Sequence, residues 1–156
     1  MTRKFLSITA FLTLGIAAFA SAASQEVTPI ALQRTQAAAS QNFTGEAFVT
    51  SVLQPHPESN VYAAYVTFAP GARTNWHIHP SAQTLIVTSG VGYTQEWGKE
   101  VVTLHPGDVV YCPPGVKHWH GASADQTMTH LAISQRTDRS VTWLEPVNPA
   151  DYPSKN

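Results

Sequence analysis

Short apolar runs separated by turn residues make up most of the sequence from Phe43 onward. Each run ends at Gly, Pro or a short polar turn, as in Gly98-Lys99 and His105-Pro106-Gly107. Many short strands with almost no helical periodicity predict an all-β fold, either a barrel or a double-sheet jelly roll. The expected strands are Glu46–Leu53, Val61–Phe68, Thr84–Ser89, Gly92–Trp97, Val101–Leu104, Asp108–Cys112 and Thr127–Ser134.

The first 22 residues have the pattern of a secretory signal peptide. Arg3 and Lys4 precede an uncharged run from Phe5 to Phe19, and Ala20-Ser21-Ala22 has the small-x-small pattern of a cleavage site. The run is too short to span a bilayer comfortably as a helix. We therefore expect cleavage after Ala22 or Ala23 and export, either periplasmic or secreted, with an uncleaved N-terminal anchor as the alternative.

The remaining chain divides into an arm, one domain and a tail. Residues 23–42 form the expected N-terminal arm, either a loose segment or a short helix from about Ile30 to Ser40, and residues 43–145 form the β domain. Residues 146–156 are rich in Pro, and we expect this tail to pack back on the barrel. The full length of 156 residues suits one domain with a hydrophobic core.

Charge and cysteine content exclude several partner classes. Charged residues make up 12% of the chain, about half the usual share, and the net charge is −1. Because no basic patch alternates with aromatic residues and no polybasic stretch follows the leader, neither nucleic acid nor a membrane surface is expected after cleavage. A small-molecule substrate is favoured instead. Cys112 is the one cysteine, so we expect a buried, inert thiol and no intrachain disulfide.

Four of the seven histidines lie in two pairs, His77-x-His79 and His118-x-His120. Residues two apart on a strand point to the same side, so each pair directs two imidazoles toward one place. Neutral imidazole is a common ligand of divalent transition metals, and Gln83 offers a carbonyl oxygen. Two such pairs in one chain indicate a metal site more strongly than one pair does.

Two motifs around these histidines resemble those of the cupin family. The first, G-x5-H-x-H-x3,4-E-x6-G, is matched by Gly71, His77, His79, Gln83 and Gly90, with Gln83 in place of the usual carboxylate. The second, G-x5-P-x-G-x2-H-x3-N, is matched by Gly107, Pro113, Gly115 and His118, with Ala122 in place of Asn. The resemblance implies a cupin-type double-stranded β-helix, a jelly-roll barrel, preceded by the N-terminal arm.

A narrower resemblance is to the manganese-dependent cupin hydroxynitrile lyases, the (R)-mandelonitrile lyases. It runs from about Phe43 to Trp143 and is strongest in GARTNWHIHPSAQTLIVTSGVGYTQEWG, HPGDVVYCPPGVKHWHGA and MTHLAISQ. The resemblance implies His130 as the general base. It also implies a metal held by His77, His79, Gln83 and His118, and a substrate pocket formed with Ala64, Val66, His120 and Ser134. The exported leader departs from that family, and Ser134 stands where the family can have a larger polar residue.

The chemistry of this ligand set suits a Lewis acid. Three neutral imidazoles and an amide leave a divalent ion with its full charge, whereas a glutamate ligand would reduce it. A six-coordinate ion with four protein ligands keeps two positions for water or substrate. Mixed nitrogen and oxygen ligands suit manganese or iron, and nickel and zinc remain alternatives.

The remaining histidines and Arg73 have competing interpretations. His130 is either the base, with a pKa lowered by the nearby dication, or a hydrogen-bonded core histidine. His120 either faces the outer shell of the metal or hydrogen-bonds His118. His56 and His105 are expected to be solvated, and Arg73 either anchors an anionic substrate or forms an ion pair.

Three functions remain open. The first is a lyase that cleaves or forms a carbon–carbon bond in a small hydroxy compound, most like a cyanohydrin. The second is a cupin dioxygenase, and the third is a non-catalytic periplasmic protein that binds a small ligand. The resemblance to cupins, which commonly pair through edge strands, implies a homo-oligomer, either a dimer or a tetramer.

Overall fold

The computed structural model of the chain describes residues 24–153, which are almost entirely β-structure. The expected signal peptide lies outside the described residues and stays a prediction. The one helical element among them is a single 3₁₀ turn, η1 (Ile30–Leu32). The strands are β1 (Arg34–Ala37), β2 (Phe43–Thr44), β3 (Ala47–Leu53), β4 (Val61–Phe68), β5 (Arg73–Thr74), β6 (His77–Ile78), β7 (Gln83–Gly90), β8 (Gly92–Glu96), β9 (Val102–Leu104), β10 (Val109–Cys112), β11 (Lys117–Ala122), β12 (Met128–Gln135) and β13 (Thr142–Trp143).

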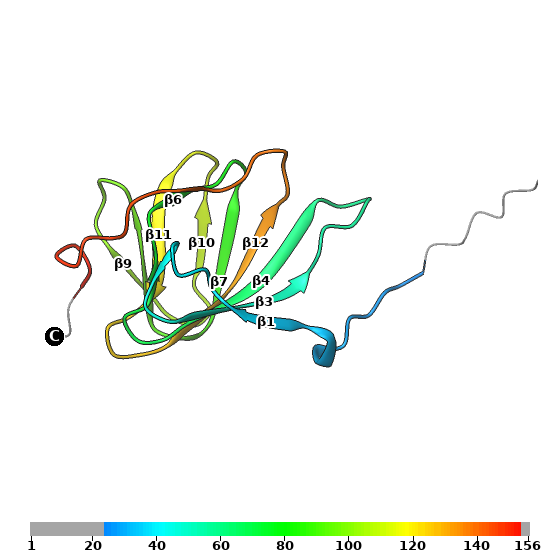
Figure 1. The fold of residues 1–156 in the computed structure, drawn as a ribbon, viewed down its shortest axis with the longest axis horizontal. Coiled ribbons are helices and arrows are strands. Elements are labelled where there is room, and N and C mark those ends of the chain that lie inside the picture. The colour runs from blue at the N-terminus through cyan, green and yellow to red at the C-terminus, as the bar shows by residue number, and fades with distance from the viewer. Residues whose placement is uncertain (1–23, 154–156) are drawn as a thin grey trace, which may run out of the picture.

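Two antiparallel sheets form a jelly-roll barrel (Figure 1), as the alternation of short strands and turns predicts. The first sheet has the order β1-β3-β4-β12-β7-β10. In the second, β13, β6, β11, β5 and β2 follow one another, and β8 joins β11 to β9. Strand β11 is therefore central to the second sheet, where it pairs with β5, β6 and β8.

Neither alternative predicted for Ile30–Ser40, a loose arm or a short helix, describes this stretch. After η1, residues Arg34–Ala37 form the edge strand β1, which pairs with β3. Thr35 Oγ1 and Thr50 Oγ1 lie 2.7 Å apart across the pair. The unpaired edge of β3 offers a row of backbone groups, and pairing with it outweighs the weak local preference for a helix.

Tight turns hold the two sheets together, and Gly90 shows why glycine is needed at one of them. This residue ends β7 with φ +75°, and a Cβ there would lie 1.8 Å from Thr127 O. A side chain would therefore meet both an unfavourable backbone conformation and a direct clash. The last glycine of the first motif is thus a structural requirement of the β7–β8 turn.

The core fills the space between the sheets, and the C-terminal tail covers one side of it. The main cluster contains Phe68, Leu104 and Met128, which are 0%, 3% and 0% exposed. A second cluster joins Trp76 and Trp119 to Val147 of the tail. Tyr152 Oη donates a hydrogen bond to Ala122 O at 2.7 Å. The prediction that the tail packs back on the barrel is confirmed for the described residues up to 153.

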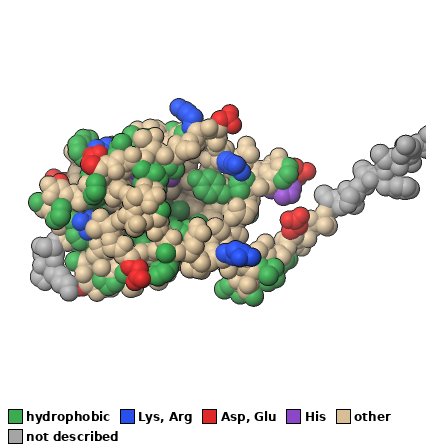
Figure 2. Space-filling view, in the orientation of Figure 1, with side chains coloured by type: hydrophobic (Ala, Val, Ile, Leu, Met, Phe, Trp, Pro, Cys, Tyr) green, Lys and Arg blue, Asp and Glu red, His purple; other side chains and the backbone are tan. Residues whose placement is uncertain are grey.

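No helix in the described part of the chain is both long and apolar enough to traverse a bilayer. On the face seen in Figure 2, charged side chains stand singly or in small groups among polar and apolar ones. No continuous basic patch is visible on that face.

Candidate metal centre

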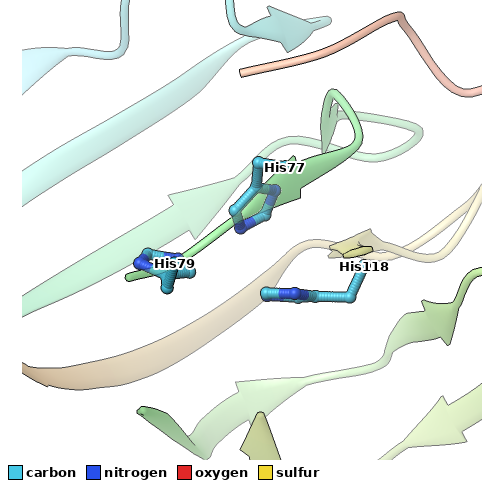
Figure 3. Close-up of side chains that lie close together, drawn as sticks. All are labelled: His77, His79 and His118. Carbon is cyan, nitrogen blue, oxygen red and sulfur yellow. The ribbon is translucent and has the colours of Figure 1, made fainter. Parts of the chain in front are cut away.

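Three buried histidines converge between two paired strands of the second sheet. His77 in β6 is the register partner of His118 in β11, and His79 follows β6 directly. One ring nitrogen from each histidine lies within 4.8 Å of those of the other two. Figure 3 shows the three rings gathered in the space beside the two strands. This cluster is compatible with a divalent metal ion.

Backbone carbonyls determine which nitrogen of two of these rings faces the cluster. His77 Nδ1 lies 2.9 Å from Asn75 O, and His118 Nδ1 lies 3.0 Å from Val116 O. A carbonyl only accepts, so each Nδ1 carries the proton and donates, which leaves Nε2 with a free lone pair. Such partners orient metal-binding imidazoles in proteins.

Gln83, the first residue of β7, completes the cluster from the opposite sheet. Its Oε1 atom lies 3.3 Å from His118 Nε2. Because that Nε2 has no proton when Nδ1 donates, two acceptors face each other, and a cation bound to both would satisfy them. His79 Nε2 is also buried and has no hydrogen-bond partner among residues 24–153. These unsatisfied acceptors fit a bound cation.

Burial keeps the clustered imidazoles unprotonated. Desolvation is the main cause in each case: it lowers the pKa of His77 well below its usual range, lowers the pKa of His79 to about 4, and lowers the pKa of His118. Repulsion from His118 adds to the shift at His77 and His79. A metal ligand must be neutral imidazole, so the cluster is in its binding form at neutral pH.

A second pair of histidines lies deeper in the barrel. His130 in β12 is fully buried, and its Nε2 lies 3.0 Å from His120 Nδ1. The His120 ring lies 4.7 Å from that of His130 and 5.3 Å from that of His77, between centroids. His120 therefore contacts His130 instead of hydrogen-bonding His118. Burial lowers the pKa of His130 to about 4.

The regular alternation of β12 brings His130 into the barrel, because buried Met128 lies two residues before it on the same face. The pairing of β12 with β7 shifts between Thr129 and His130, where β7 has one extra residue, Thr88, so that His130 lies opposite buried Val87. His130 and Ser134 are the buried residues in this part of β12, and Ser134 lies opposite Gln83.

The other predicted pocket residues lie at different depths. Val66 is the register partner of His130 and belongs to the main core cluster. Ala64, two residues earlier, is half-buried and lines a pocket of about 720 Å³ at the end of β4. Ser134 is 4% exposed, and its Oγ has no hydrogen-bond partner among the described residues.

The sequence relatives agree with this geometry. Residues 64–134 match the Cupin_2 family, described as a cupin domain. A protein of Granulicella tundricola named (R)-mandelonitrile lyase is 50% identical over 111 residues, which cover 70% of this chain and 85% of that protein. The chain belongs to the cupin family.

Solved structures show the same cupin fold. A cupin-like protein from Thermotoga maritima has a TM-score of 0.71 and 42% identity, over 74% of this chain and 89% of that one. A cupin-2 domain protein from Rhodospirillum rubrum has a TM-score of 0.63 and 20% identity, over 82% of each chain. At that lower identity the likeness concerns the fold alone.

Arg73 and Cys112 lie away from the solvent in this cupin. The Arg73 guanidinium packs 4.3 Å from the Tyr152 ring centroid and donates to Gly71 O and Val147 O. It therefore stabilises the tail, and among residues 24–153 it forms no ion pair, while the anchoring of an anionic substrate stays a prediction. Cys112 is 5% exposed, and burial raises its thiol pKa to about 11, as expected for an inert cysteine.

The isolated histidines lie where the sequence predicts, and the tryptophans divide between core and surface. His56 and His105 are exposed. Trp76 and Trp119 belong to the core, whereas Trp97 is 57% exposed and lies against Lys117.

Proposed function

We propose that this cupin is a metal-dependent lyase that cleaves or forms a carbon–carbon bond in a small hydroxy compound. The specific reaction that we favour is cleavage of an aromatic cyanohydrin to an aldehyde and cyanide. The observation that carries the proposal is the buried His120–His130 pair beside the cluster of His77, His79 and His118. The 50% identity to a protein named (R)-mandelonitrile lyase supports the same reaction class.

The proposed ligands are His77, His79, Gln83 and His118, and manganese is the proposed ion, with iron, nickel and zinc as alternatives. When bound, the ion would supply a Lewis acid for the hydroxyl oxygen of the substrate. The amide of Gln83 adds no negative charge, so the full charge of the ion remains available to that oxygen. Ala64, Val66, His120 and Ser134 are proposed to border the substrate.

His130 is proposed to move the proton. Its Nε2 is occupied by His120 Nδ1, and its buried Nδ1 has no partner among the described residues. Nδ1 is thus the atom that takes the hydroxyl proton, while Nε2–H donates to His120. The carbon–carbon bond then breaks with its electron pair on cyanide, which recovers the proton from His130. The lowered pKa keeps His130 unprotonated, as an acceptor must be.

The direct test is release of benzaldehyde from (R)-mandelonitrile by mature protein loaded with manganese, in the absence of oxygen. The proposal expects turnover well above that of metal-free protein. Turnover that requires oxygen would instead assign a dioxygenase. Saturable binding without consumption of any substrate would assign a binding protein, and both results would reject the lyase.

Export and self-association are proposed alongside this reaction. The leader pattern of residues 1–22 supports a periplasmic or secreted enzyme. Strand β1 is an edge strand, and near it Val27, Ile30 and Leu32 are 77%, 83% and 69% exposed, which supports a homo-oligomer, dimer or tetramer. N-terminal sequencing of protein from the periplasm tests removal of the leader, and a retained leader would refute it. Sedimentation of the same protein tests self-association, and a monomer at micromolar concentration would refute it.

A further inference from the structure

The loop between β12 and β13 forms part of the approach to the candidate metal centre. A pocket of about 550 Å³ opens onto His79 and is also lined by Pro114, Gly115 and Arg139. Gly115 N donates a hydrogen bond to His79 O at 3.0 Å, so this wall is tied directly to the cluster. Strand β13 pairs with β6, which places the end of the loop beside the histidine strand.

Arg139 stands where two pockets meet. It lines the pocket at His79 and also the pocket of about 720 Å³ that reaches Ala64, as do Pro80 and Ser140. Among the described residues that line the pocket at His79, Arg139 is the only one with a permanent charge. Asp138 lines the larger pocket but not the one at His79.

The backbone of Arg139 is held in place, whereas its side chain is free to bind. Thr137 Oγ1 donates to Arg139 O at 2.9 Å and accepts from Arg139 N at 3.2 Å. The guanidinium is exposed, and within residues 24–153 it has no ion-pair or hydrogen-bond partner. Ser140 and Thr142 add hydroxyl groups to the same pocket wall.

We infer that Arg139 binds a carboxylate of the substrate, so that the substrate class is a small hydroxy acid with its carboxylate remote from the reacting hydroxyl. This inference rests on the proposed function, because it assumes that the hydroxyl is held at the histidine cluster. Guanidinium is well matched to carboxylate, with two parallel N–H donors for two oxygens. A cation at the cluster and Arg139 at the rim give the pocket a positive field that favours anions.

The test is binding of two ligands with the same hydroxyl group, measured calorimetrically on the full mature chain loaded with manganese. 4-(Hydroxymethyl)benzoate carries the remote carboxylate, and benzyl alcohol lacks it. The acid should bind about two- to fivefold more tightly, the range of an exposed ion pair. Arg139→Gln should remove this preference and leave benzyl alcohol binding unchanged.

Arg34→Gln provides the matched control, because Arg34 is an exposed arginine on β1 that lines neither of the two pockets. It should keep the preference for the acid. Undetectable binding of the acid, equal affinity for the two ligands, or an unchanged preference in Arg139→Gln would each overturn the inference. Binding is measured without turnover, so a negative mandelonitrile assay would reject the lyase reaction and leave the preference for the carboxylate standing. A missing preference for the carboxylate would reject the role of Arg139 and leave the lyase reaction standing.

Discussion

Hydrogen bonds to backbone carbonyls hold two imidazoles of the cluster in place before any ion arrives. Asn75 O and Val116 O each lie two residues before the histidine they bind, within the same chain segment. The ring orientation of His77 and His118 therefore depends on local backbone geometry and needs no distant side chain. A ligand set fixed in this way loses little conformational freedom when it binds a cation.

Side-chain alternation on strands pointed to the two histidine pairs, and the resemblance to the cupin lyases implied His77, His79, Gln83 and His118 as the ligands, which the structure brings close together. The partner of His120 was missed. Its contact with His130 joins the two sheets, and such a contact depends on strand register, which spacing along one segment does not specify. Arg139 was also missed, because an arginine in a polar loop has no sequence pattern that distinguishes a ligand-binding residue from an ordinary surface residue.

Replacement of His130 by Ala tests its role in proton transfer. We expect kcat to fall at least about 100-fold, the usual contribution of a general base, while the metal content stays unchanged. Turnover of (R)-mandelonitrile and elemental analysis on the same preparation measure the two effects. His105→Ala, at an exposed position, should change neither quantity. Full activity in His130→Ala would remove the base role.

At the scale of elements, strands with alternating apolar residues were predicted well and short pairing strands were not. The predicted runs Val61–Phe68 and Thr127–Ser134 correspond to β4 and β12. Strands β5, β6 and β13 have two residues each, too few to show a period. The stretch Arg34–Ala37 is a strand only because the edge of β3 is available to it.

A comparison of two glycines tests the account of the β7–β8 turn. Gly90 and Gly98 have φ of +75° and +79°. Of the two, only Gly90 has other atoms within 4 Å of the place that a Cβ would occupy. Gly98→Ala should lower the free energy of unfolding by about 1 kcal/mol, the cost of the backbone conformation. Gly90→Ala should lower it by more than about 2 kcal/mol, because the clash with Thr127 adds to that cost. Equal losses in urea denaturation would contradict the argument.

At the scale of the whole molecule, the two sheets bring distant segments to one site, and the chain after β12 closes one end of it. In Figure 1 that segment runs back across the end of the barrel. It pairs β13 with β6, so that Trp143 lies opposite His77. The same passage carries Arg139 to the pocket at His79. One crossing therefore supplies both a wall of the site and a charged group at its entrance.

Burial of histidines in the barrel makes the stability of the metal-free protein depend on pH. The pKa of His79 and of His130 falls from 6.5 to about 4 on folding, so between these values the unfolded chain binds more protons. The free energy of unfolding should thus decrease as pH falls from 6.5 toward 4 and level off above 6.5. Urea denaturation with a chelator present measures this free energy. His130→Gln should reduce its dependence on pH. A wild-type free energy of unfolding that stays constant between pH 6.5 and 4 would contradict the prediction.

The central claim is that three imidazoles and one amide hold a single divalent cation inside the barrel. Elemental analysis after manganese loading and gel filtration tests it most directly. We predict about one equivalent per chain in the wild type and in His105→Ala, and less than about a tenth of that in His118→Ala, which removes a ligand and its contact with Gln83. A wild-type chain that retains no metal, or a His118→Ala variant that retains a full equivalent, would contradict the account.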